Sequence, residues 1–236
     1  MSAELLPALL TAVLAAAPAG FDLPGGTVDA ALGPGGTIVC LRADSPEIVL
    51  IDSTGAETAL WDLERAVLPV SVASLPDGSF LVCDASSSSI VRYTDRAEPV
   101  ESMAVPGGTC AIAAYGPEIW CFSPDAGEVS SIPGMHWIAD AEGFRPADLS
   151  LEGRRAVLSS SSGALLIEPG IAVTLPGGPS CLAGGRIFSL DGDSLREASG
   201  SVEPAFVPGV FDRIEGHPDG RMLLWNTADA KAVLLE

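Results

Sequence analysis

Four charged residues fall at comparable positions in separate segments of the chain, and together they could support acid–base or metal chemistry. Asp29, Asp148 and Glu215 are acidic, and Arg213 is basic. Carboxylate oxygens are the ligands that Ca²⁺ prefers, so the acidic trio is a candidate metal site and all four are candidate binding residues. The alternative, which we favour, is a polar, water-filled surface that holds no metal. Ser71, Thr109 and Asp212 occupy similar positions.

The two histidines have different surroundings. His136 lies in segment 134–146, with Trp137 and Arg145 close by, so these three residues are candidates for a ligand-binding loop. A purely structural role for His136 is the alternative. His217 precedes Pro218 and is expected in a solvent-exposed turn. The motifs of serine hydrolases, zinc proteases, phosphate loops and EF-hands are absent, so no catalytic residue is assigned.

The chain has five cysteines. Cys40, Cys83 and Cys121 each end a hydrophobic run, which favours a plain role as small core residues. Cys110 and Cys121 flank segment 114–117 symmetrically and form a candidate disulfide if the protein is exported. No CxxC motif is present, which argues against structural zinc.

A repeated phrase indicates which elements position these residues. The sequences LPGGTVDAA, VPGGTCAIA and LPGGPSCLA begin at residues 23, 105 and 175. Each belongs to a longer unit with a turn glycine, and successive turn glycines are separated by 43, 38, 37, 31 and 36 residues. Each unit holds about four short apolar runs between Gly, Pro, Asp and Ser clusters. Six such units predict an all-β, six-bladed propeller of four-stranded antiparallel blades.

The two ends of the chain are expected to meet in the last blade. The last unit stops at Glu236 after its third run, whereas the first LPGG phrase precedes any complete unit. Segment 19–26 should therefore supply the missing fourth strand and remove an open sheet edge. We expect residues 21–236 to form one propeller domain. Residues 1–20 form an N-terminal apolar segment, which is either a secretion signal or a capping helix.

One unit resembles a known repeat. Segment 70–94 is similar to an NHL-type repeat through Pro76, Asp77, Gly78, Val82, Asp84 and Ile90. Segment 214–236 shares the Pro218-Asp219-Gly220 turn. The resemblance implies an NHL-like or gluconolactonase-like six-bladed propeller, a family that includes binding platforms, lactonases and lyases. The lactonases use a metal supported by asparagines. This chain has only Asn226, which argues against that site.

The net charge of −19 excludes some partners. Nucleic acid and anionic membrane surfaces need clustered Lys and Arg, which the chain lacks. The apolar N-terminus favours export to the periplasm or the outside, and a cytoplasmic protein is the alternative.

A scaffold without a catalytic motif favours a non-enzymatic, monomeric binding module that presents an acidic surface to a protein or glycan partner and needs no cofactor. The alternative is a lactonase-like hydrolase or lyase that uses channel carboxylates, with or without a divalent cation. An enzyme should have a deep pocket where Asp29, Asp148 and Glu215 converge. A platform should have a filled channel and an exposed apolar patch.

Overall fold

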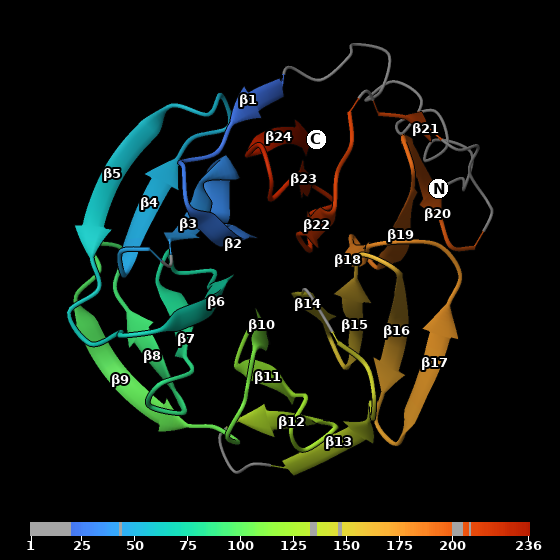
Figure 1. Ribbon diagram of the computed structural model, residues 1–236, viewed down its shortest axis with the longest axis horizontal. Helices are drawn as coiled ribbons and strands as arrows, with labels where there is room; N and C mark the ends of the chain where they lie inside the picture. The colour runs from blue at the N-terminus through green and yellow to red at the C-terminus, as the bar shows by residue number, and fades with distance from the viewer. Residues whose placement is uncertain (1–19, 43, 133–135, 146–147, 200–204, 208) are drawn as a thin grey trace, which may run out of the picture.

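The protein is a ring of six four-stranded antiparallel sheets around a central channel (Figure 1), as the repeats predict. The computed structural model describes residues 20–42, 44–132, 136–145, 148–199, 205–207 and 209–236. Within these ranges the one helical element is the short 3₁₀ turn η1 (Pro34–Gly36). No helix among them has the length and apolar character needed to cross a membrane.

The first five blades follow the chain from the inner strand outward. The first blade consists of β2 (Thr27–Leu32), β3 (Ile38–Arg42), β4 (Glu47–Ile51) and β5 (Glu57–Asp62). The second consists of β6 (Pro69–Ser74), β7 (Phe80–Asp84), β8 (Ser89–Tyr93) and β9 (Pro99–Ala104). The third consists of β10 (Ala111–Tyr115), β11 (Glu118–Ser123), β12 (Glu128–Ile132) and β13 (His136–Asp140). The next two are β14 (Asp148–Glu152), β15 (Arg155–Ser160), β16 (Gly163–Glu168) and β17 (Ile171–Leu175); and β18 (Ser180–Ala183), β19 (Arg186–Asp191), β20 (Ser194–Glu197) and β21 (Ala205–Phe206).

The sixth blade joins the two ends of the chain, which confirms the predicted closure. Its strands are β22 (Arg213–Gly216), β23 (Met222–Trp225), β24 (Lys231–Leu235) and, outermost, β1 (Gly20–Asp22). Phe21 lies opposite Ala232 in the β1–β24 register. Residues 1–19, for which the sequence predicts a secretion signal or a capping helix, lie outside the described residues.

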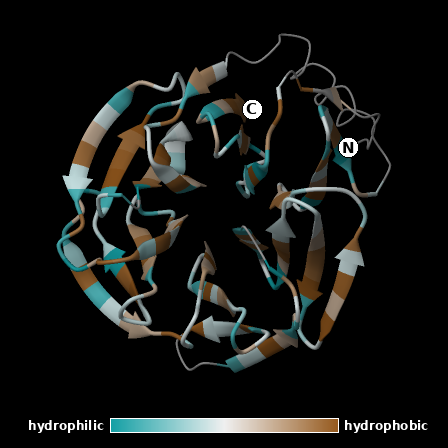
Figure 2. Cartoon of the chain, in the orientation of Figure 1, coloured by the Kyte–Doolittle hydropathy of each residue, from teal (hydrophilic) through white to brown (hydrophobic). Residues whose placement is uncertain are grey.

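The hydrophobic core consists of six clusters, one between each pair of neighbouring blades. Middle strands have blades on both sides, so every residue of β7 is buried. Outer strands such as β5 and β9 are mostly exposed, and Figure 2 shows their mixed hydropathy. The channel-facing edge of each blade is therefore held rigidly, which fixes the side chains that point into the channel.

The register corrects one alignment drawn from the turn glycines. Leu32 pairs with Ile38 in the first blade and Ser74 pairs with Phe80 in the second, so Gly36 rather than Gly35 corresponds to Gly78. Cys83 is therefore one position further along its strand than Cys40. Because side chains alternate between the two faces of a strand, the two thiols face opposite sides of their blades. Both are buried, in agreement with a core role.

Candidate functional site in the central channel

Three inner strands bring together the four charged residues singled out from the sequence. Asp29 lies on β2, Asp148 begins β14, and Arg213 and Glu215 belong to β22. Asp29 and Asp148 are only 3% and 7% exposed. Glu215 keeps some accessible surface because it lines a cavity. Three carboxyl groups thus share one region of the channel with a single guanidinium.

The proximity of these carboxyl groups perturbs their titration. Burial, and then the charge of Asp148, raise the pKa of Asp29 to about 7. Burial also raises the pKa of Asp148, although Arg213 opposes the shift. Burial, followed by the charges of Asp148 and Asp29, raises the pKa of Glu215 well above its usual value. These effects favour the protonated, neutral form of Glu215.

Hydrogen bonding separates the roles of the two aspartates. Asp29 accepts hydrogen bonds from the amide of Ala30 at 3.0 Å and from the amide of Val72, in the next blade, at 2.8 Å. Both of its oxygens are thus engaged, and the contact with Val72 joins two blades. Asp148 Oδ1 accepts from the amide of Leu149 at 2.7 Å, but its buried Oδ2 has no hydrogen-bond partner among the described residues. An unsatisfied buried carboxylate oxygen is costly and favours a ligand that donates to it.

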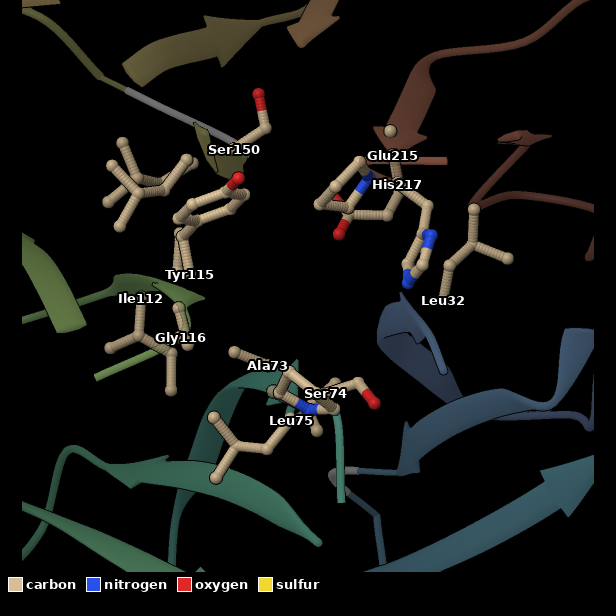
Figure 3. A pocket seen from close by; sticks show the side chains of 18 of the residues that line it. Leu32, Ala73, Ser74, Leu75, Ile112, Tyr115, Gly116, Ser150, Glu215 and His217 are labelled. Atoms are coloured by element: carbon tan, nitrogen blue, oxygen red, sulfur yellow. The ribbon is translucent and has the colours of Figure 1, made fainter. Parts of the chain in front are cut away.

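A cavity of about 470 Å³ opens above this group, at the end of the channel where the inner strands finish. This volume suits a small organic molecule. Its walls are mainly apolar, and five of the six blades contribute to them. Figure 3 shows Glu215 and His217 projecting from one side, with Tyr115 and Ser150 on the other. The carboxyl and imidazole groups in its lining are those of Asp148, Glu215 and His217.

His217 begins a turn, as expected, but its side chain is only 25% exposed and lines this cavity. It directly follows β22 and projects from the same side of the cavity as Glu215 (Figure 3). His217 Nδ1 lies 2.8 Å from Asp219 Oδ1, and Arg221 approaches the other oxygen of Asp219 at 2.7 Å. Although burial opposes the shift, hydrogen bonds from Arg221 and His217 lower the pKa of Asp219 to about 2. Asp219 is therefore a fixed anion that orients the imidazole.

Gly216 holds Glu215 and His217 in place through close packing. A Cβ atom built on Gly216 would lie 1.9 Å from the carbonyl oxygen of Leu182 on β18. Only glycine permits this approach between the fifth and sixth blades. The sequence contains a signal for this site, because Leu75 also precedes a Pro-Asp-Gly turn and also lines the cavity. The position before that turn is therefore the channel end of an inner strand.

The other polar residues of the inner-strand alignment have structural contacts. Ser71 Oγ accepts a hydrogen bond from the amide of Ile112 at 3.2 Å, between the second and third blades. Thr109 Oγ1 donates to the carbonyl of Pro106 at 2.7 Å. Asp212 accepts from the amide of Thr227 at 2.9 Å in an exposed turn, so it does not belong to the channel group.

The candidate loop around His136 lies far from the cavity in the fold. His136 and Trp137 belong to β13, the outer strand of the third blade, and not to a loop. Trp137 Nε1 donates to Asp140 Oδ1 at 3.0 Å. His136, Trp137 and Arg145 are exposed, and none of them lines the channel cavity.

All five cysteines are free thiols, including the candidate pair Cys110 and Cys121. Cys121 lies opposite Ile112 in the register, while the Cys110 amide donates to the carbonyl of Phe122. Burial raises the pKa of the Cys110 thiol to about 11, which makes it a weak nucleophile.

The channel carboxyl groups do not fit the Ca²⁺ ion that the lactonase resemblance implies. Among the described residues, no three His, Cys, Asp or Glu side chains are grouped so that they could hold a metal ion. Both oxygens of Asp29 already accept hydrogen bonds from backbone amides, and burial of Glu215 favours its neutral form. Ca²⁺ instead requires several ionised or carbonyl oxygens around one point.

Comparisons with known proteins show the fold alone. No protein-family model and no curated protein sequence matches the chain. A structure of streptogramin B lyase matches with a TM-score of 0.61 at 12% identity, covering 92% of this chain and 86% of the lyase. A chain in a nidogen/laminin complex matches with a TM-score of 0.62 at 13% identity, covering 80% of this chain and 84% of that one. The PQQ-bound aldose sugar dehydrogenase of Streptomyces coelicolor matches with a TM-score of 0.60 at 16% identity, covering 93% of this chain and 99% of the dehydrogenase. The protein is thus a six-bladed β-propeller, an architecture that enzymes and binding proteins share.

Proposed function

We propose that the protein is a hydrolase or lyase that acts on a small organic molecule in the channel cavity. The observation that carries this proposal is that Glu215, on β22, and His217, directly after it, project into the same apolar cavity. An open pocket at the converging carboxyl groups is what we expect of an enzyme, whereas a binding platform should have a filled channel.

The proposed base is His217 Nε2. Nδ1 lies 2.8 Å from Asp219 Oδ1, and in the tautomer whose N–H at Nδ1 donates to this carboxylate, Nε2 is free to accept a proton. The Asp219 amide also approaches Nδ1, but at 3.3 Å this is the weaker contact. The proposed acid is Glu215, because burial and the neighbouring carboxylates raise its pKa and so favour the protonated form. Acid and base thus have separate environments at the channel end of β22.

These two groups support either of two reactions with balanced proton transfers. In a lyase, His217 removes a proton from carbon while Glu215 protonates the leaving oxygen, so that C–H and C–O bonds break and a C=C bond forms. In a hydrolase, His217 removes a proton from water and the water oxygen bonds to the carbonyl carbon. The C–O bond between that carbon and the leaving oxygen then breaks, and Glu215 protonates the leaving oxygen. Asp148 Oδ2 would accept a hydrogen bond from the substrate in both cases.

Turnover of a panel of lactones, esters and β-elimination substrates tests the proposal. Glu215→Gln and His217→Gln should each lower kcat/KM by about 100-fold or more, because each removes an acid or base. His136→Gln is the matched control, since the other histidine is exposed on an outer strand. Full activity in both channel variants, or an equal loss in the control, would overturn the assignment.

The second candidate function is binding of a glycan at the outer surface. It is favoured by the exposure of Trp137, which is 51% accessible while its ring N–H is held by Asp140. Exposed rings of this kind offer a flat apolar face to a sugar. Titration with an oligosaccharide panel should quench tryptophan fluorescence and Trp137→Ala should abolish the change. No quenching by any member would remove this candidate.

A further inference from the structure

A groove between the second and third blades continues the channel cavity toward the outside of the ring. Its volume is about 460 Å³. Leu75, Pro76 and Gly116 line both the groove and the channel cavity. A Cβ atom built on Gly116 would meet nothing within 4 Å, so no side chain or backbone closes the space beside this residue. The two hollows therefore adjoin and share part of their walls.

The middle of the groove is apolar. Leu81, Met103 and Ile119 line it, and all three belong to the cluster between the second and third blades. Met103 and Ile119 keep part of their surface exposed. An apolar chain lying there would remove this surface from water, which is the main source of affinity for such a chain.

The edge of the groove has an excess of negative charge. Arg92 makes an ion pair with Asp77 at 2.6 Å, and Glu101 lies opposite Arg92 in the register of β8 and β9. Two acidic side chains and one guanidinium thus line this edge. An anionic group on the ligand would be repelled here, whereas a neutral or cationic ligand would not.

At the channel end of the same path, one buried oxygen has no hydrogen bond of normal geometry. Asp148 is nine-tenths buried and its carboxyl group interacts with that of Glu215, but its Oδ2 has no such hydrogen-bond partner among the described residues. Glu215 lies beside it on the cavity wall. A protonated amine carries several N–H donors, and so would satisfy this oxygen with a charge-assisted hydrogen bond.

We propose that the cavity and the groove form one two-part site for an elongated, apolar amine. Its ammonium group donates to Asp148 beside Glu215, and its apolar arm passes Gly116 to cover Met103 and Ile119. This inference deepens the proposed function by naming a class of substrate, and it rests on that proposal only for the statement that the bound amine is converted.

Binding of unbranched alkylamines, from butylamine to decylamine, tests the proposal by calorimetry. In the wild type, each added methylene should raise the affinity about three- to fourfold until the groove is filled. Met103→Trp fills the groove, so the affinity should stop rising at the chain length that fills the channel cavity alone. Met103→Ala widens the groove and should lower the gain per methylene. Val173→Trp is the matched control, because Val173 is exposed on β17 of another blade.

Asp148→Asn tests the amine end and should weaken all chain lengths by the same factor. The proposal is overturned if no amine binds, if Asp148→Asn leaves affinity unchanged, or if Met103→Trp and Met103→Ala both keep the wild-type gain per methylene. Thermal melts of each variant separate these outcomes from misfolding. Chain-length-dependent binding in a protein that turns over no substrate would instead refute the proposed enzyme and leave the two-part site standing.

Discussion

Gly216→Ala is a direct test of how the site is positioned. The new Cβ atom would lie 1.9 Å from the Leu182 carbonyl oxygen, while ordinary contact begins at 3.4 Å. Strand β22 or β18 must therefore move by about 1.5 Å, the difference between these two values. The backbone of Gly216 does not have a positive φ, so the penalty comes from this contact and not from backbone strain.

The expected cost follows from two opposing effects. Overpacking of a rigid interior costs about 1–3 kcal/mol or more. Alanine also restricts the unfolded chain, which raises the free energy of unfolding by about 0.4–1 kcal/mol. A net loss of about 2 kcal/mol should lower the Tm by roughly 4–8 °C in a protein of this size.

Differential scanning calorimetry measures this effect against Gly107→Ala. A Cβ atom at Gly107 meets nothing within 4 Å and its φ is not positive, so that variant should melt like the wild type or slightly higher. Because Gly216 separates Glu215 from His217, its variant should also lose activity. A Gly216→Ala protein that melts within a degree of the wild type, or an equal loss in Gly107→Ala, would refute the argument.

Three other outcomes are expected. Deletion of residues 1–26 removes β1 and the buried Leu23. It should lower the free energy of unfolding by about 3 kcal/mol or more and the Tm by roughly 6–12 °C. A deletion variant that melts like the full chain would contradict closure by β1. Asp29 has a pKa of about 7 in the folded protein, against an ordinary value of 3.8. Its contribution to the free energy of unfolding is therefore complete below pH 3.8 and is lost as the pH rises through about 7. Asp29→Asn should therefore flatten the fall in unfolding free energy across this range in denaturant titrations, and an unchanged slope would refute the assignment. Thiol titration of protein denatured without reductant should find five free thiols, whereas a 110–121 disulfide would leave three.

The sequence was sufficient to predict the ring and its closure because both depend on local chemistry. Turn glycines between short apolar runs indicate hairpins. A last unit with only three runs indicates a missing strand. Local spacing could not separate Gly35 from Gly36, since both have a positive φ in the same turn. The choice depends on pairing across the hairpin, which the register between Leu32 and Ile38 decides.

The site was harder to predict because it depends on how the blades are arranged. The convergence of Asp29, Asp148 and Glu215 follows from their places on inner strands, and the sequence indicated it. His217 was assigned to solvent because His-Pro-Asp-Gly is typical of an exposed turn. In the ring, the residue before that turn ends an inner strand and faces the cavity. A pattern within one unit therefore predicts the turn but not what lies across the channel from it.

Closure of the ring and occupation of the cavity are thermodynamically linked. Glu215 and His217 belong to or directly follow β22, whose blade is complete only when β1 pairs with β24. The cavity walls come from five blades, so the cavity exists only in the closed ring. A ligand that binds there binds the folded state alone and must raise the free energy of unfolding as its concentration exceeds its Kd. Conversely, weakening the contact between β1 and β24 lowers the population able to bind, and so lowers the apparent affinity at a site that β1 does not touch.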